Sequence, residues 1–546
     1  MKDHWERLFE RDAVGALEAR LPSALAAARW FGGKARTIIS TRINKTIPIP
    51  MDGRMMMLAL IQVSYADDAH DTYLMLVSAS FDERAEELAR ACPDAVLADL
   101  SVIEHTGERR GILHDALSDP TCARFLLLII QEGARFETKG GVLAASALEG
   151  FGPLLSEAAS DGPSVMKGEQ SNTSVRFGAR AILKLYRRFE EGINPDLEVG
   201  RALTTRGFAH SPALLGSLEY RRPGQEPSTV ALVQAFIENQ GDAWQYTLRE
   251  LERHLASVPD DLTGTWAPSA GSATDAGFQA YMDLAETLGR RTAELHLVLG
   301  RQTDDPAFAP EICTSGYWRS LRSRMERSIK SSLILLRRRL SDLGSVEQRQ
   351  ASLVLDLEQQ LLSRVGALTD RNLEVQRIRC HGDYHLGQVL YTGRDFVIID
   401  FEGEPARPLA ERRAKHVSIV DVAGMIRSFD YAAYAAVQRH AERRNERRLQ
   451  PGLEQPELEQ WARRWSRSAS EAFLSGYAAS AGEAAFWPTS ADERTMLLEA
   501  HLIEKACYEL SYELNNRPSW SGIPLQGLLR LCDVENEAPS QEEVGS

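Results

Sequence analysis

Residues 381–405 read HGDYHLGQVLYTGRDFVIIDFEGEP, and this stretch decides the fold that we predict for the chain. Apolar residues alternate on both sides of the TGR segment at 392–394, a pattern that predicts a hairpin of two short strands. A hairpin folds its ends back on one another, so we expect Asp383 and Gln388 to lie near Asp400.

The residues at the ends of this hairpin carry the groups of a phosphoryl-transfer site. Asp383 can orient a substrate hydroxyl and accept its proton, while Gln388 and Asp400 offer the hard oxygen ligands that suit Mg²⁺. Such enzymes need these parts because their catalysis is mostly positioning and charge neutralisation. Two other interpretations stay open: an ordinary polar turn with satisfied histidines, and a metal-dependent hydrolase with His381, Asp383 and His385 as ligands.

A second stretch, residues 167–186, has the pattern of a nucleotide cradle. It predicts a strand, a small polar loop and then two further strands joined by a turn. The loop can present hydroxyl and backbone N–H groups to phosphate oxygens through Ser171, Asn172, Thr173 and Ser174. It departs from the glycine-rich kinase loop, so the motif alone is weak.

The strand that follows contains a lysine among apolar neighbours. The Lys184 ammonium must therefore reach solvent or meet a counter-charge. We predict that it pairs with Glu198, on a helix that Pro195 and Asp196 open. A strand lysine held by a helix glutamate positions the α and β phosphates in kinases. The alternative is a surface lysine on an edge strand.

Several of these segments resemble a known family. HGD at 381–383, followed by GQ at 387–388 and IDFE at 399–402, resembles the catalytic and metal loops of the aminoglycoside phosphotransferase-like branch of the kinase fold. The glutamine at 388, where most of that branch has asparagine, and the extended IDFEGEPARPLAERR resemble bacterial maltokinases, both stand-alone and fused to trehalose synthase. RWFGGKAR, NPDLEVGR and YELSYELNNRPSW resemble further maltokinase segments.

This resemblance implies roles for individual residues. Asp383 is expected to be the catalytic base, and Gln388 and Asp400 to hold magnesium. Adenine is expected near Gln234 and Phe236, at the end of a strand that leads into a hinge. Two structural roles are also expected: Asp421 braces the catalytic loop through its backbone amides, and His296 is a hydrogen-bonded core histidine.

A C-terminal helix carries the residues that we assign to the sugar. Lys505, Tyr508, Glu509 and Tyr512 are spaced i, i+3, i+4 and i+7, so they are predicted to share one helix face. Aromatic rings can pack on the C–H face of a sugar while charged groups bind its hydroxyls. We assign His381 to the same site. The alternative is a tyrosine stripe used for packing.

We therefore predict an α+β, bilobal, protein-kinase-like fold with an N-terminal, mostly β cap subdomain and a helical C-lobe. The predicted parts are a cap at 1–95, an intermediate N-lobe with the nucleotide-binding sheet at 96–240, a helical C-lobe with the catalytic and sugar sites at 241–532, and a disordered acidic tail at 533–546. The RWFGGK segment at 29–34 is interpreted as a tight turn with buried aromatic rings.

Composition narrows the class of protein. At 546 residues the chain is too long for one core, and 43% hydrophobic with 26% charged residues is typical of globular proteins. The net charge of -14 argues against nonspecific binding to nucleic acid or an anionic membrane. The six cysteines lack metal-ligand spacing and the N-terminus has no apolar signal segment, so a cytoplasmic location is predicted.

The resemblance implies a kinase that uses ATP and Mg²⁺ to phosphorylate the anomeric hydroxyl of maltose, and it also implies association with trehalose synthase. One alternative is a kinase of glucosamine, another amino sugar or an aminoglycoside, which would share the nucleotide residues and differ at the acceptor. Another is a non-catalytic nucleotide-binding partner of a trehalose-processing enzyme.

Overall fold

The computed structural model describes residues 5–10, 13–51, 53–104, 107–152, 162–166, 171–256, 273–369, 373–448 and 456–533. The chain divides into two compact units, Met1–Glu238 and Asn239–Ser546, which we call the first and the second unit. The predicted disordered tail, from residue 534 on, and residues 167–170 of the predicted phosphate loop lie outside the described residues.

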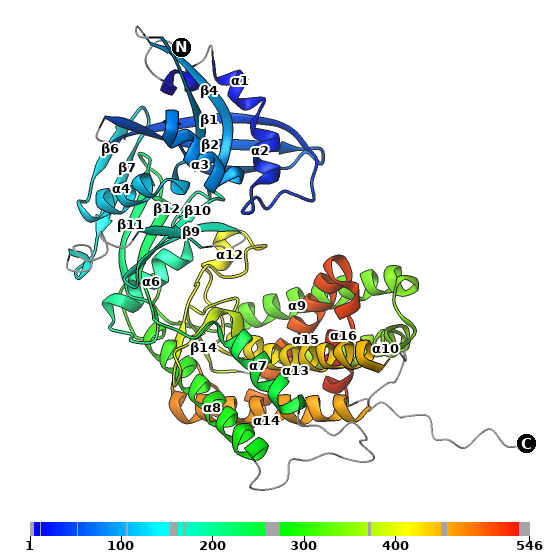
Figure 1. Ribbon diagram of the computed structural model, residues 1–546. Coiled ribbons are helices and arrows are strands. Elements are labelled where there is room, and N and C mark those ends of the chain that lie inside the picture. Colours follow the sequence, from blue (N-terminus) through cyan, green and yellow to red (C-terminus); the bar gives the residue numbers. More distant parts are fainter. Residues whose placement is uncertain are drawn as a thin grey trace, which may run out of the picture. The chain divides into compact units, whose positions relative to one another are not determined.

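The first unit begins with an antiparallel five-stranded sheet, drawn in blue in Figure 1. Its strand order is β1-β2-β3-β5-β4, with β1 at Ile38–Met51, β2 at Arg54–Tyr65, β3 at His70–Phe81, β4 at Val96–Glu104 and β5 at Gly107–Asp115. The helices of this part are η1 (Trp5–Phe9), α1 (Val14–Glu18), α2 (Leu21–Ala27), α3 (Asp82–Ala91), η2 (Pro93–Ala95) and η3 (Ala116–Ser118). A subdomain that ended at residue 95 would lose β4 and β5, so the sheet extends the cap to Asp115.

The double glycine of RWFGGK forms a packed turn before β1. Phe31 is only 2% exposed, and its ring centroid lies 5.0 Å from that of Tyr73. A Cβ atom at Gly33 would lie 2.5 Å from the Tyr65 hydroxyl oxygen, so a larger residue there would clash. The tight-turn interpretation of this motif is therefore confirmed, although Trp30 is half-buried rather than buried.

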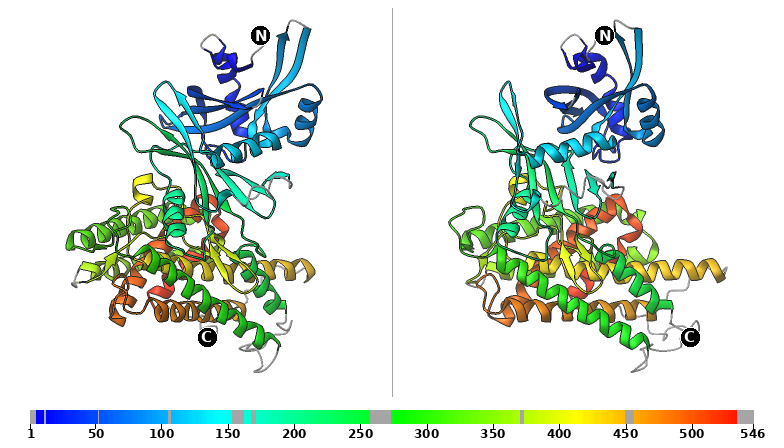
Figure 2. Two further views of the ribbon diagram at one scale, coloured as in Figure 1. Left: turned by 90° about the vertical axis from the view of Figure 1, so that its left-hand side faces the viewer. Right: turned by 60° about the vertical axis from the view of Figure 1, so that its left-hand side comes forward.

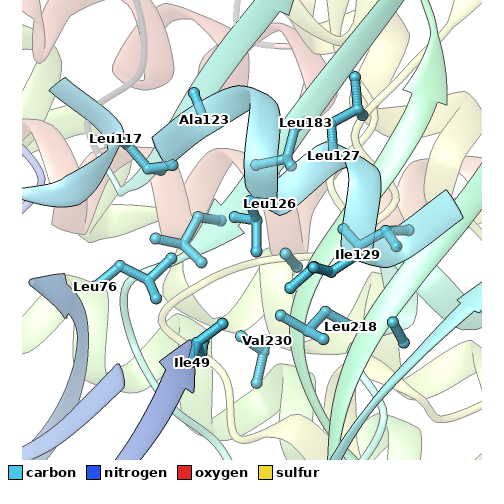
Figure 3. Close-up of a cluster of buried hydrophobic side chains, with 14 of the residues drawn as sticks. Ile49, Leu76, Leu117, Ala123, Leu126, Leu127, Ile129, Leu183, Leu218 and Val230 are labelled. Carbon is cyan, nitrogen blue, oxygen red and sulfur yellow. The ribbon is translucent and has the colours of Figure 1, made fainter. Parts of the chain in front are cut away.

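A second, seven-stranded sheet follows in the same unit, with the order β6-β7-β11-β12-β10-β9-β8. Its strands are β6 (Arg135–Thr138), β7 (Gly141–Ala147), β8 (Pro163–Val165), β9 (Asn172–Phe177), β10 (Ala181–Tyr186), β11 (Leu214–Arg221) and β12 (Ser228–Ala235). Helix α4 (Pro120–Gln131) packs on one face together with strands of the first sheet, and Figure 3 shows Leu126 and Leu127 of α4 among Ile49, Leu76, Leu183 and Leu218. Helix α6 (Pro195–Thr205) packs on the other face, through a small cluster that includes Tyr186 and Leu197.

The second unit is mostly helical. Its helices are α7 (Ala243–Ala256), α8 (Ala273–Leu299), α9 (Ser315–Arg339), η4 (Leu340–Asp342), α10 (Ser345–Asp356), α11 (Glu358–Gly366), η5 (Ala367–Thr369), η6 (Leu386–Gln388), α12 (Leu409–Arg412), α13 (Ile419–Arg448), α14 (Pro456–Ala481), α15 (Ala491–Asn516), η7 (Pro518–Trp520) and α16 (Gly522–Leu531). Two short pairs complete it, β13 (Glu311–Ile312) with β14 (Gln376–Arg377), and β15 (Val389–Tyr391) with β16 (Phe396–Ile398).

Helices α8 and α14 run side by side in Figures 1 and 2. They approach closely because glycines face backbone on both sides: a Cβ atom at Gly289 would clash with the Phe473 carbonyl, and one at Gly476 with the Glu286 carbonyl. Among the described residues, no helix is both long enough and apolar enough to cross a membrane.

Candidate active site

The predicted hairpin is present. Strands β15 and β16 are antiparallel, with Val389 opposite Ile398, and the turn closes where the Thr392 N–H and hydroxyl both donate to the Asp395 carbonyl at 2.9 and 3.0 Å. At the open end, the Ile399 N–H donates to the Gln388 carbonyl at 3.0 Å, which extends the pairing by one residue. Gln388 and Asp400 therefore both lie at the open end of the hairpin, Gln388 just before β15 and Asp400 just after β16.

Asp400 has a left-handed backbone, with φ of 65°. This conformation is unfavourable for a residue with a Cβ atom and persists where the surroundings impose it, often at functional sites. The amide oxygen of Gln388 and the carboxylate of Asp400 are oxygen donors of the kind that suits Mg²⁺, which binds one or two carboxylates and keeps several waters. The residues present therefore fit the ion, and their role as its ligands stays a prediction.

The loop before the hairpin is held by a buried carboxylate on α13. Asp421, 1% exposed, accepts hydrogen bonds from the His381 N–H at 2.7 Å and the Gly382 N–H at 2.9 Å. His296, fully buried, bonds the same carboxylate at 3.0 Å and the Tyr477 hydroxyl at 2.8 Å. Burial raises the pKa of Asp421, but the hydrogen bond and charge of His296, together with His381 and the Gly382 N–H, outweigh it, so the net pKa is lowered. Both structural predictions, for Asp421 and His296, are confirmed.

The histidines of the loop are used to hold its backbone. His381 is 1% exposed; its Nε2 donates to the Ile399 carbonyl at 2.9 Å, and its Nδ1 lies 3.4 Å from the Asp383 N–H. The His385 Nδ1 accepts from the Gly387 N–H at 3.0 Å. Our assignment of His381 to the sugar is therefore corrected: it positions the loop against the hairpin. Among the described residues, no group of metal-ligand atoms combines His381, Asp383 and His385.

Asp383 lies at the wall of a cavity in the second unit. Its side chain is 18% exposed, and the Lys505 Nζ lies 3.6 Å from Asp383 Oδ1. Tyr508 lines the same cavity, and burial together with the nearby Glu404 carboxylate raises the pKa of its phenol. The cavity measures about 60 Å³, so a sugar ring needs the side chains of the rim to move apart.

The other two residues assigned to the sugar lie elsewhere. Glu509 is buried, and its Oε2 accepts from the Arg427 Nε at 2.9 Å and from another Arg427 nitrogen at 2.7 Å. Tyr512 is 47% exposed and is not part of the cavity wall. Consecutive helix residues point about 100° apart, so when Tyr508 faces the cavity Glu509 faces the neighbouring helix α13.

The stripe that faces the cavity begins one turn earlier. His501, Glu504, Lys505 and Tyr508 all line it, and they have the same i, i+3, i+4, i+7 spacing as the predicted set. His501 Nδ1 lies 3.4 Å from Glu504 Oε2, and Arg324 lies 3.3 Å from the other oxygen. Burial opposes ionisation, yet the contact with His501 and the charge of Arg324 lower the pKa of Glu504 to about 2. The residues that we missed, among them Glu404, Arg407 and His416, carried no periodic signal because they lie in the segment after the hairpin.

In the first unit, Lys184 donates to Asp196 Oδ2 at 3.1 Å, and the Tyr186 hydroxyl donates to the same oxygen at 2.9 Å. Asp196 stands in the first turn of α6, whose N-cap is Asn194. The helix start was predicted, but Asp196 was not expected to hold the lysine. The pairing of Lys184 with Glu198 stays a prediction.

The predicted phosphate loop is largely a strand. Strand β9 begins at Asn172, and Ser174 lies opposite Lys184 on β10. Because side chains alternate along a strand, Thr173 points to the other face, where its hydroxyl accepts from the Arg187 Nε at 2.8 Å. The prediction of a loop here is wrong for residues 172–174, because pairing with β10 extends the strand, and only Ser171 precedes it.

The residues assigned to adenine lie at the end of β12. Gln234 pairs with Ile182 and Leu214 of the neighbouring strands, and the Phe236 N–H donates to the Arg180 carbonyl at 2.9 Å. The first unit ends just beyond them, at Glu238. Their contact with adenine stays a prediction.

Comparison with known proteins gives two domain matches. Residues 164–403 match the family model described as "Phosphotransferase enzyme family", and residues 25–119 match the "Maltokinase N-terminal cap domain". The second match ends past residue 95, in agreement with the extent of the first sheet.

Two curated relatives are glucosamine kinases. The one from Streptacidiphilus jiangxiensis is 24% identical over 332 residues, which are 60% of this chain and 66% of the relative. The one from Mycolicibacterium smegmatis is 28% identical over 278 residues, or 49% of this chain and 58% of the relative. The matched region thus spans less than two thirds of either relative.

Solved structures show the fold. A glucosamine kinase in complex with glucosamine, ADP and inorganic phosphate aligns with a TM-score of 0.59 at 19% identity, covering 93% of this chain and 98% of the other. A second crystal form of glucosamine kinase gives 0.60 at 20%, covering 94% and 99%. The predicted α+β kinase-like fold, with its mostly β cap and helical C-terminal part, is confirmed. Residues 164–403 are thus similar to the phosphotransferase enzyme family, and residues 25–119 are similar to maltokinase N-terminal cap domains.

Proposed function

We propose that this protein transfers the γ-phosphoryl group of ATP to a hydroxyl of a small sugar, and that the acceptor is the anomeric hydroxyl of maltose. The observation that carries this proposal is the position of Asp383. It stands on a loop braced by Asp421, directly before the hairpin with Gln388 and Asp400, and beside a cavity lined by Lys505 and Tyr508.

In the proposed reaction, Asp383 accepts a hydrogen bond from the sugar hydroxyl and takes its proton as the oxygen attacks phosphorus. The Lys505 Nζ lies 3.6 Å from this carboxylate. Gln388 and Asp400 would hold magnesium, which neutralises phosphate charge when bound. In the first unit, Lys184 binds phosphate oxygens while Asp196 fixes its position.

The cap domain and the cavity support maltose as the first candidate. The cavity wall presents three cations, Lys505, Arg407 and Arg412, and five carboxylates, those of Asp383, Glu404, Glu411, Asp421 and Glu504. Asp421 already accepts from the loop backbone and Glu504 is paired with Arg324, so three cations and three carboxylates remain for sugar hydroxyls, which both donate and accept. The second candidate is glucosamine, which the names of the relatives suggest, and for which Glu404 beside Tyr508 offers a counter-charge to an ammonium group.

The test is ADP release from ATP and Mg²⁺ in parallel reactions with maltose, methyl α-maltoside, glucosamine, glucose, trehalose and no sugar. We expect turnover with maltose and none with methyl α-maltoside, which is matched in size but has no free anomeric hydroxyl. Turnover with glucosamine alone would overturn the acceptor and keep the reaction class. ATP binding without turnover on any sugar would favour a non-catalytic partner, and co-elution with trehalose synthase would test the predicted association.

A further inference from the structure

The first unit contains a cavity that the proposed reaction does not use. It measures about 850 Å³ and is bounded by α2, α3, η2 and β4 of the cap and by β8 and β9 of the second sheet. Thr173 of β9 faces it, whereas Lys184 lies on the opposite face of that sheet with Asp196 and α6. The cavity is therefore distinct from the predicted phosphate site in the same unit.

One wall of this cavity is formed by a buried guanidinium. The Arg187 side chain is 1% exposed. Its Nε donates to the Thr173 hydroxyl at 2.8 Å, one terminal nitrogen donates to Asp115 Oδ2 at 2.5 Å, and its Cζ lies 4.6 Å from the centroid of the Trp30 ring. The remaining terminal nitrogen, NH1, has no hydrogen-bond partner among the residues that the structure describes.

A buried charged donor without a partner is unfavourable, and the described residues offer NH1 no acceptor, so an acceptor from a bound molecule would be favourable there. The other contacts of Arg187 hold the guanidinium in a fixed orientation, and NH1 is itself buried, so a ligand reaches it only by displacing the side chains that cover it. The RWFGGK turn, which the proposed reaction leaves without a role, supplies Trp30 and Arg29 to the same cavity.

The lining identifies the chemical class of the ligand. Three cations, Arg29, Arg84 and Arg187, are balanced by three carboxylates, Glu87, Asp94 and Asp115. A nucleotide or another strongly anionic ligand would require more cations than carboxylates, and in this lining the two are equal in number. The rest is mostly alanine, proline and leucine with Trp30, so the cavity combines apolar surface with both donors and acceptors. Saccharides match that combination, because their C–H faces are apolar and their hydroxyls both donate and accept.

We propose that this cavity is a second saccharide site, in which Arg187 NH1 donates to a hydroxyl oxygen of a neutral sugar that packs against Trp30. A cavity of this size lies in the range of sites for small ligands, about 300–1,000 Å³. The choice of a sugar as the ligand rests in part on the proposed function, whereas the existence of the site rests on the cavity and on Arg187.

The chain contains its own reporter for this site. Cys92 lines the cavity and is half-buried, while Cys122, Cys313, Cys380, Cys507 and Cys532 are buried. The rate at which a thiol reagent labels Cys92 can therefore be measured on the native full-length protein with maltose or maltotetraose added. At ten times the dissociation constant only about one site in eleven is free, so we expect labelling to slow about tenfold. Cys92→Ser identifies the labelled thiol.

Variants separate the site from the acceptor cavity. Asp383→Asn should keep the protection of Cys92, because that residue belongs to the other unit. Trp30→Ala should weaken protection, and Ala91→Trp should remove maltotetraose binding measured by calorimetry in the Asp383→Asn background. Arg90→Trp is the matched control, since it places the same side chain on α3 at a residue outside the cavity wall.

Labelling of Cys92 that is unchanged by either sugar up to its solubility would overturn the proposal, as would protection by ATP alone. Protection without turnover in the acceptor screen would remove the proposed function and leave this site standing. Turnover without protection of Cys92 would support the proposed function and overturn this second site.

Discussion

Each unit of the molecule contains a lysine beside an aspartate, and the two pairs differ in distance and in solvent exposure. In the first unit, Lys184 and Asp196 are 3.1 Å apart with side chains 8% and 5% exposed, and Tyr186 bonds the same carboxylate. In the second unit, Lys505 and Asp383 are 3.6 Å apart and 29% and 18% exposed. The first distance is a hydrogen bond, whereas the second is longer than one.

This difference teaches what each pair is built to do. A buried, hydrogen-bonded pair has a single geometry, because separating its charges leaves them without water. An open pair exchanges partners with little loss, because water and substrate hydroxyls replace the missing contact. The first pair suits a lysine that must be held in one place. The second suits a carboxylate that must accept a new hydrogen bond in every reaction cycle.

The largest effect should come from removing the base of the open pair. Asp383→Asn keeps the shape of the side chain but cannot take a proton, so we expect ADP release with the preferred sugar to fall about 10³-fold. The melting temperature should stay close to that of the wild type, because the lost pair is partly exposed. A rate within tenfold of the wild type would show that Asp383 is not the base.

Breaking the closed pair should instead destabilise the fold. Lys184→Met removes the ammonium that donates to the buried Asp196 carboxylate, and breaking a buried pair in this way destabilises by about 3 kcal/mol. The measurement is urea unfolding of the purified variant.

A double variant is the control for this loss. Asp196→Asn added to Lys184→Met also removes the buried carboxylate charge and should recover part of the stability. An unfolding free energy of Lys184→Met within about 1 kcal/mol of the wild type would contradict the view that the pair is closed.

Short-range patterns predicted much of both sites. The hairpin of β15 and β16 and the start of α6 after Asn194 depend on residues that are close in sequence, and both are present. It was harder to predict which face of a helix meets the site and where a strand begins. Periodicity predicted the spacing of the residues on the cavity-facing side of α15, but not which turn of α15 meets the cavity, since that depends on how α15 packs against α13.

The same limit applies to the first unit. Asp196 and Glu198 both lie in the first turn of α6, and sequence spacing does not say which of them reaches Lys184 on β10. That choice depends on how the helix docks on the sheet. The start of β9 at Asn172 likewise depends on pairing with a strand about ten residues away, which a local count of polar residues does not reveal.

A pH experiment tests whether water reaches His416, which lines the same cavity as Lys505 and Asp383. Burial, followed by the charges of Arg324 and Arg407, lowers the pKa of His416 to about 4. Its contribution to stability is complete above the unfolded pKa of about 6.5 and is lost as pH falls toward 4. We expect the free energy of unfolding to fall by about 2 kcal/mol more in the wild type than in His416→Gln between pH 6.5 and 4.5. If the free energy of unfolding changes equally with pH in the two proteins, His416 is accessible to water and the prediction is wrong.

The smallest change in stability should follow from removing the lysine of the open pair. Lys505→Met deletes one partly exposed partner, so its free energy of unfolding should fall by less than about 1 kcal/mol, as in the surface control Lys330→Met. Catalysis should respond more. The loss of one charged hydrogen bond to a sugar hydroxyl, about 1.5 kcal/mol, raises the KM for the acceptor about tenfold and leaves the KM for ATP unchanged. If Lys505→Met is instead as unstable as Lys184→Met, the two pairs are alike, and the open pair is a structural brace with no particular suitability for a changing partner.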